Sequence, residues 1–90
     1  MLVKFFATYR HIAGCSSFEL AAPCDVLALL HELSSRWPAF KPLLLSSDGA
    51  DLGPDAIVMV NGRHIEHLDG VATPLQDCDR VAVTPLVAGG

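Results

Sequence analysis

The sequence is poor in charge, in aromatic residues and in the features that mark membrane or nucleic-acid-binding proteins. Of its 90 residues only 18% are charged and 7% aromatic, whereas 51% are hydrophobic, a balance typical of one folded domain rather than a disordered chain. The net charge of −4 argues against nucleic acid as a partner and favours a basic protein partner. No apolar run is long enough to cross a bilayer and no signal-type stretch opens the chain. We therefore expect a cytoplasmic protein without a membrane partner.

The cysteines and histidines form no recognisable covalent or metal-binding pattern. Cys15, Cys24 and Cys78 are an odd number without a C-x-x-C pair, which indicates reduced thiols and not a disulfide framework. His64 and His67 fall on an expected strand, where residues three apart face opposite sides, and no cysteine or carboxylate completes a ligand set. No catalytic triad, phosphate-binding loop or carboxylate pair can be assembled. We predict no metal site, no bound cofactor and no catalytic side chains.

The first half of the chain predicts two strands followed by one main helix. Alternating residues over 2–10 predict a strand, with Val3, Phe5, Ala7 and Tyr9 on its core face. Residues 17–22 return as a second strand, so a hairpin opens the fold. The helix begins after Asp25, a good N-cap, and ends before Pro38. Its apolar stripe comprises Val26, Leu29, Leu30, Leu33 and Trp37.

The second half predicts three more strands after an irregular, turn-rich segment with one helical turn near 43–45. Residues 56–60 form an apolar strand closed by Asn61-Gly62, a strong hairpin signal. Residues 63–68 return as a short strand with Ile65 inward, and 80–86 form the last strand. The order β-β-α-β-β-β predicts an α+β fold, a mixed sheet of four to five strands with one main helix packed across it. Residues 1–86 would form this domain and 87–90 a flexible C-terminal tail.

That order resembles the ubiquitin-like β-grasp fold, and three stretches resemble the MoaD/ThiS-type sulfur carriers. "KFFATYRHIAG" is similar to the F-A-x-x-R-x-x-A-G opening of the molybdopterin synthase small subunits. "VMVNGRHIEHLDGVATPLQDCDRVAV" resembles their V-N-G hairpin and T-P-L-x-D-G-D-x-V approach to the last strand. "TPLVAGG" resembles the ending P-P-V-A-G-G. Cys78, Thr84 and Leu86 depart from this pattern, replacing a turn glycine, an aromatic residue and a second proline.

The resemblance implies that the C-terminal carboxylate of Gly90 is the reacting group. An E1-like enzyme would adenylate it with ATP, and a persulfide donor would convert the acyl-adenylate to a thiocarboxylate. The large subunit of molybdopterin synthase would then receive the tail and pass the sulfur to a pyranopterin precursor of the molybdenum cofactor. The chain would be a co-substrate, not an enzyme. Val87, Ala88 and Gly89 would thread the partner's pocket, aided by glycines that lack a Cβ atom.

The same resemblance places the last strand beside the first, which gathers candidate partner-binding residues on one face. Phe6 would point outward next to Thr84 and Leu86, and Pro85 would restrict the chain where it leaves the sheet. Arg10 would pair with an acidic group of the partner. His64 shares the outer face. The candidate docking residues are Phe6, Arg10, His64, Thr84, Pro85 and Leu86.

Three alternatives stay open at the level of the sequence. The carrier could serve thiamine or cysteine synthesis, although the "FATYR…AG" opening favours the molybdopterin route over the thiamine route. The chain could be a protein modifier joined through Gly90 to lysines of other proteins. It could also be an interaction module whose tail does nothing. Lysine adducts would indicate the modifier, whereas a free thiocarboxylate would indicate the carrier.

Overall fold

A computed structural model describes residues 1–86, which form one five-stranded sheet with helices on one side. Val87–Gly90, the expected tail, lie outside the described residues. The strands pair in the order β2-β1-β5-β3-β4, with β5 parallel to β1 and antiparallel to β3. They span β1 Leu2–Phe5, β2 Ser17–Glu19, β3 Ala56–Val60, β4 Arg63–His64 and β5 Arg80–Pro85. The first and last strands are neighbours, as predicted, and the sheet is the mixed one expected of a β-grasp domain.

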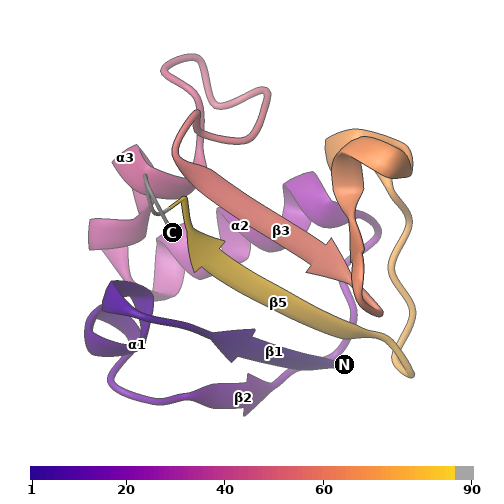
Figure 1. Ribbon diagram of the computed structural model, residues 1–90, viewed down its shortest axis with the longest axis horizontal. Helices are drawn as coiled ribbons and strands as arrows, with labels where there is room; N and C mark the ends of the chain where they lie inside the picture. The colour runs from indigo at the N-terminus through magenta and orange to yellow at the C-terminus, as the bar shows by residue number, and fades with distance from the viewer. Residues whose placement is uncertain (87–90) are drawn as a thin grey trace.

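The main helix, α2 (Val26–Arg36), crosses one face of the sheet and leaves the other face open (Figure 1). The Asp25 side chain accepts a hydrogen bond of 2.8 Å from the Ala28 N–H, which confirms the predicted N-cap. The helix ends at Arg36, with Trp37 as its C-cap just before Pro38. Its predicted stripe is buried, with Trp37 partly so, and packs on the inward residues of the sheet. None of the helices within residues 1–86 is long and apolar enough to cross a membrane.

Although aromatic residues are few, they are concentrated in the core. The Phe5 ring stacks on Phe40 with centroids 5.5 Å apart and meets the edge of Trp37, also at 5.5 Å. Phe18 from β2 packs edge-on against Trp37 at 5.2 Å. Phe40 belongs to the short 3-10 helix η1 (Pro38–Phe40) that follows α2. Each such pair contributes about 0.5–1.5 kcal/mol beyond its buried area, so this cluster fixes β1, β2 and α2 relative to one another.

The first strand is shorter than predicted, because the chain turns into a helix three residues after it ends. Extended structure stops at Phe5, and Ala7 takes a φ of +52°. A short helix, α1 (Thr8–Ala13), follows and ends at Gly14, whose φ of +71° is the left-handed conformation that suits glycine. Tyr9 is buried as expected, but from this helix, with its ring 5.5 Å from that of Phe40. Ala7, predicted to face the core, is exposed.

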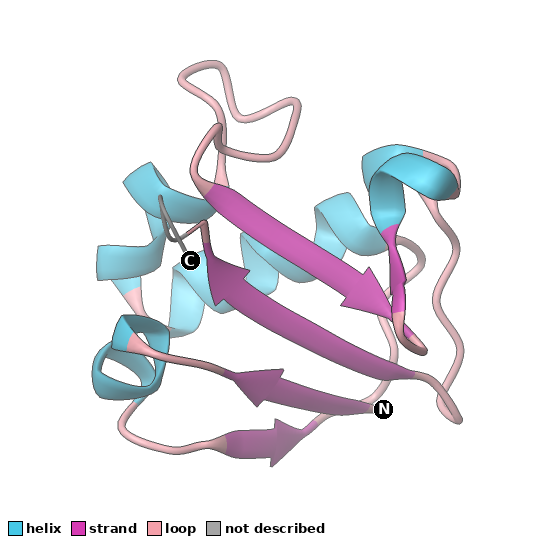
Figure 2. Cartoon of the chain, in the orientation of Figure 1, coloured by secondary structure: helices cyan, strands magenta, loops and turns pink. Residues whose placement is uncertain are grey.

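The other differences concern short elements around the sheet (Figure 2). The second strand stops at Glu19 instead of continuing to residue 22. The helical turn predicted near 43–45 is α3 (Lys41–Leu44), and the segment between the last two predicted strands contains the 3-10 helix η3 (Gly70–Ala72). The predicted strand 63–68 keeps only β4, because the chain enters the 3-10 helix η2 (Ile65–His67). The His64 Nδ1 atom accepts from the Glu66 N–H at 3.1 Å and so caps that turn.

The Asn61-Gly62 hairpin is confirmed, and it also holds the beginning of β5. Asn61 and Gly62 have φ values of +52° and +82°, as a two-residue hairpin turn requires. The Asn61 N–H donates to the Arg80 carbonyl at 2.8 Å, and its side-chain oxygen accepts from the Arg80 N–H at 2.9 Å. Its amide nitrogen donates to the Asp79 carboxylate at 2.9 Å. Asn61 therefore links the β3–β4 turn to the start of the last strand.

Candidate functional site

The end of β5 is fixed on both sides, and this defines where the C-terminal residues leave the domain. The Leu86 N–H donates to the Asp55 carbonyl at 2.7 Å, which continues the pairing with β3 one residue beyond the strand. On the other side, the Phe6 N–H donates to the Val83 carbonyl at 3.2 Å, one residue beyond β1. We call residues 83–86, with Phe6 beside them, the tail root. Because both neighbouring segments bind it, the position from which residues 87–90 extend is set by the sheet.

Two large hydrophobic side chains are exposed at this end of the sheet. Phe6 is 44% exposed and Leu86 56% exposed, and Leu43 on α3 is the remaining large exposed hydrophobic residue among residues 1–86. Thr84 and Pro85 are partly buried, and the Thr84 hydroxyl donates to the Pro85 carbonyl at 3.4 Å. Exposed apolar residues grouped at one place mark protein interaction surfaces more often than scattered ones do. The structure thus brings Phe6, Thr84, Pro85 and Leu86 to the same end of the sheet.

One row of residues crosses the open face of the sheet from one edge strand, β2, to the other, β4. In the strand register, Ser17, Lys4, Ala82, Met59 and His64 lie side by side in one row across all five strands. The inward neighbours of this row are buried under α2, so its own side chains face the uncovered side (Figure 1). His64 is therefore on the outer face, as its position in the sequence suggested.

Arg10 and the two histidines lie differently from the sequence-based expectation. Arg10 is exposed on α1 and not on a strand, so the argument that placed it beside Phe6 by strand alternation was wrong. The rings of His64 and His67 are 6.3 Å apart and edge to face, not on opposite sides, because His67 lies in the turn of η2. Within residues 1–86 no third His, Cys, Asp or Glu joins them to form a group that could hold a metal ion.

Tyr9 is a residue near the tail root that the sequence reasoning assigned only to the core. It is 2% exposed on α1, which packs against β5. Burial raises the pKa of the Tyr9 phenol, and the negative charge of Asp55 raises it further. Asp55 is also the residue whose carbonyl holds Leu86. A helical reading of "TYRHIAG", with glycine as the C-terminal cap, would have placed Tyr9 here.

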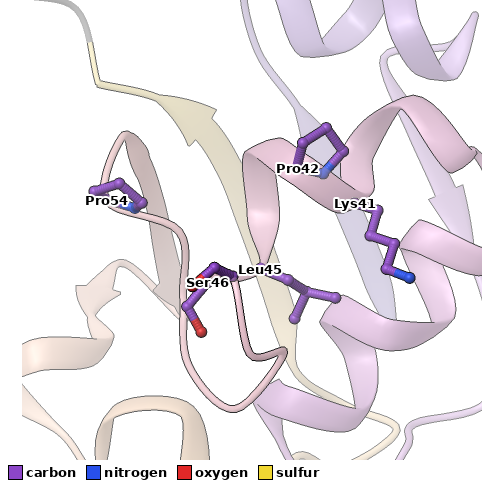
Figure 3. A pocket seen from close by; sticks show the side chains of 6 residues that line it. Lys41, Pro42, Leu45, Ser46 and Pro54 are labelled. Atoms are coloured by element: carbon purple, nitrogen blue, oxygen red, sulfur yellow. The ribbon is translucent and has the colours of Figure 1, made fainter.

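A groove between α3 and the loop that follows it offers no catalytic arrangement (Figure 3). It has a volume of about 430 Å³ and is lined by Lys41, Pro42, Leu45, Ser46, Ser47 and Pro54. The Ser46 hydroxyl donates to the Asp48 carboxylate at 2.7 Å and accepts from the Asp51 N–H at 3.0 Å. The first of these bonds, with a further one from the Ala50 N–H, lowers the pKa of Asp48. The Lys41 ammonium lies on the other side of Leu45 from that hydroxyl, and Asp48, which accepts from the hydroxyl, is a weak base because its pKa is lowered.

The described surface offers one candidate contact area for another protein, at the tail root. The groove holds no activated nucleophile, and the tail root combines a fixed backbone with exposed apolar side chains. The predicted roles of Val87, Ala88, Gly89 and Gly90 lie outside the described residues.

Comparison with known proteins gives matches along nearly the whole chain. Residues 3–90 match the ThiS family. The chain is 38% identical over 90 residues to small archaeal modifier protein 3 of Haloferax volcanii, covering 98% of this chain and 96% of that protein. The solution structure of small archaeal modifier protein 1 from Methanosarcina acetivorans is 30% identical, with a TM-score of 0.85 and coverage of 99% and 94%. A Pyrococcus furiosus protein, provisionally assigned as molybdopterin converting factor subunit 1, is 30% identical, with a TM-score of 0.73 and coverage of 96% and 95%.

Proposed function

This chain belongs to the ThiS family, and we propose that it is a ubiquitin-like carrier whose Gly90 carboxylate is activated by an E1-like adenylating enzyme. The observation that carries the proposal is that the family match runs through residue 90 and includes the Gly-Gly ending. The fixed tail root and its exposed Phe6 and Leu86 support it, because they provide a rigid docking surface next to the reacting end.

The chemistry at Gly90 follows from the poor reactivity of a free carboxylate. Attack of the carboxylate on the α-phosphate of ATP would release pyrophosphate and leave an acyl-adenylate with AMP as a good leaving group. A persulfide donor would displace AMP, and cleavage of the acyl disulfide by a thiol would leave the thiocarboxylate. A lysine amine attacking the activated acyl group would form an isopeptide bond instead. Gly89 and Gly90 lack a Cβ atom, so they suit the narrow entry to such an enzyme site.

The relatives favour protein modification as a use of the activated tail. Both the Haloferax volcanii and the Methanosarcina acetivorans proteins carry the name small archaeal modifier protein. By analogy, Gly90 would be joined to lysines of other proteins. This use requires an activating enzyme and a supply of target lysines, and no pocket on the carrier itself.

Sulfur donation to a pyranopterin precursor is the second candidate, because specific sequence features favour it. The "FATYR" opening and the "TPLVAGG" ending resemble molybdopterin synthase small subunits, and the Pyrococcus furiosus relative is assigned to that factor. In this role the large synthase subunit would bind the tail root and receive residues 87–90. A persulfide donor would be required in addition to the activating enzyme.

The central test is the intact mass of the chain after incubation with ATP, the adenylating enzyme of the source organism and a sulfur source. Carrier chemistry predicts a mass increase equal to exchange of one oxygen for one sulfur. Deletion of Gly90 should abolish the increase, and Gly90→Ala should slow it because the added methyl group impedes entry. If the wild-type chain yields no acyl-adenylate with the enzyme, the proposal is wrong. Lysine-linked adducts in cells would select modification over sulfur donation.

The docking role of the tail root is tested by substituting its exposed hydrophobic residues. We expect Phe6→Ser and Leu86→Ser each to weaken binding of the adenylating enzyme by about tenfold, as for apolar residues buried at an interface centre. Leu43→Ser is the matched control, because Leu43 is a large exposed hydrophobic residue on α3, on the other side of the sheet. If all three variants bind the enzyme with the affinity of the wild type, the tail root is not part of the interface.

A further inference from the structure

A second feature of the open face lies at its far end from the tail root. A hollow of about 200 Å³ opens there, next to the β3–β4 turn and the start of β5, and is lined by Lys4, Met59, Gly62, Arg80, Val81 and Ala82. Ala82 lies between Lys4 and Met59 in the strand register. The walls of this hollow are therefore apolar in the middle and cationic on two sides.

The two cations have no carboxylate partner in the described structure. Within residues 1–86, neither Lys4 nor Arg80 takes part in an ion pair, and both are exposed. Asp79, the neighbour of Arg80, is bound instead by the side-chain amide of Asn61 and by the Gln76 N–H. The nearest strand carboxylate on this face, Glu19, lies opposite Leu2 and does not line the hollow.

We propose that this hollow binds an aspartate or glutamate side chain of the enzyme that activates the tail, and so forms a second docking point. The inference rests on the proposed function, since it concerns the partner that takes Gly90. A carboxylate here would meet two positive charges, and its methylene groups would pack on Met59 and Ala82. The hollow has room for one such side chain and not for a helix or a strand. The hollow is thus complementary to a single acidic side chain that projects from an otherwise apolar surface of the enzyme.

The separation of the two docking points gives the hollow a function that the tail root alone cannot supply. Arg80 and Leu86 are the two ends of one extended segment, about 20 Å apart at the usual rise of a strand. Contact at one end only would leave the carrier able to rotate about that contact. Contact at both ends fixes the direction of β5, and therefore the direction in which residues 87–90 enter the enzyme. The hollow is positively charged, whereas the whole chain has a net charge of −4. From that net charge we expected a basic partner, but the hollow favours an acidic group of the partner.

The test compares the reversal of two positive charges in the hollow with the reversal of one positive charge elsewhere. The double variant Lys4→Glu/Arg80→Glu and the control Lys41→Glu, an exposed lysine on α3, are assayed by ATP–pyrophosphate exchange with the adenylating enzyme of the source organism. We expect the double variant to raise KM for the carrier about tenfold or more, because it loses a charged contact with the enzyme. High salt should raise the wild-type KM toward that of the variant.

Neutral substitutions test whether the effect of the double variant comes from the lost charges and not from misfolding of the domain. Lys4→Met and Arg80→Met keep much of the side-chain volume, and each should raise KM roughly two- to fivefold, the range of a partly exposed ion pair. Thermal midpoints of all variants show whether the domain is intact. If exchange proceeds with the wild type and the double variant has the KM of Lys41→Glu, the inference is wrong and the proposed function stands. If the wild type itself supports no exchange, both the proposed function and the inference are wrong.

Discussion

Among the glycines of residues 1–86, Gly53 should be the least tolerant of a side chain, for reasons of space and not of backbone conformation. It is buried in the loop after α3, and a Cβ atom built on it would lie 2.4 Å from the carbonyl oxygen of Leu43 and 3.1 Å from its carbonyl carbon. Real Cβ atoms do not approach backbone atoms so closely, and a backbone neighbour cannot rotate away as a flexible side chain can. The loop or α3 must therefore move.

The cost of Gly53→Ala can be estimated from three contributions. Inserting a methyl group into a filled space costs about 1–3 kcal/mol. The movement also strains the hydrogen bond of 2.9 Å from the Gly53 N–H to the Leu44 carbonyl, worth about 0.5–1.5 kcal/mol. Against these, alanine reduces the entropy of the unfolded chain and returns about 0.4–1 kcal/mol. We expect a net loss of about 2 kcal/mol and, for a domain of this size, a thermal midpoint about 8–16 °C lower.

Thermal unfolding followed by circular dichroism measures this loss, with Gly14→Ala as the control. Gly14 has a φ of +71° but nothing within 4 Å of its Cβ position, so its substitution reports conformational strain alone, a net loss of about 1 kcal/mol after the smaller entropy of the unfolded chain is counted. A midpoint for Gly53→Ala equal to or above that of the wild type would refute the steric argument.

Two further predictions concern the helix cap and the buried phenol. Asp25→Ala should lower the free energy of unfolding by about 1 kcal/mol, since it removes the acceptor for the Ala28 N–H; Asp25→Asn keeps an acceptor and should lose less, and equal losses in chemical denaturation would contradict the cap. Tyr9 is the single tyrosine of the chain, so tyrosinate absorbance reports it alone and should appear above its ordinary pKa of about 10, because burial and Asp55 raise the pKa. Since the unfolded phenol ionises first, stability should fall as the pH rises above about 10, and Tyr9→Phe should remove that part of the fall.

The sequence was most informative where a structure depends on neighbouring residues. Asp25 and Pro38 marked the ends of α2, and Asn61-Gly62 marked the hairpin, because capping and turn conformations are local properties. The first strand was predicted too long because "FFATYR" alternates as a strand does, and no glycine or proline marks the left-handed conformation at Ala7. Burial of Tyr9 is compatible with either a strand or a helix, so hydrophobicity could not distinguish them.

The candidate site was predictable to the extent that it follows from strand alternation. Phe6, Thr84 and Leu86 were placed together once the terminal strands were assumed to be neighbours, and the pairing of β1 with β5 bears this out. Arg10 was assigned to the sheet only because the first strand was predicted to continue to residue 10, whereas it lies on α1. The hollow beside Lys4 and Arg80 was missed, because it depends on the register between segments nearly eighty residues apart, which no local pattern specifies.

The position of β5 in the middle of the sheet has a mechanical consequence for anything attached to its end. A pull on the tail acts along the strand, whereas the hydrogen bonds to β1 and β3 run across it. Such a load is shared among the bonds of both ladders at once and does not open them one after another. If Gly90 is joined to another protein, as we propose, an unfolding machine that pulls on the junction would have to break these hydrogen bonds together, so the domain would resist unfolding from that end.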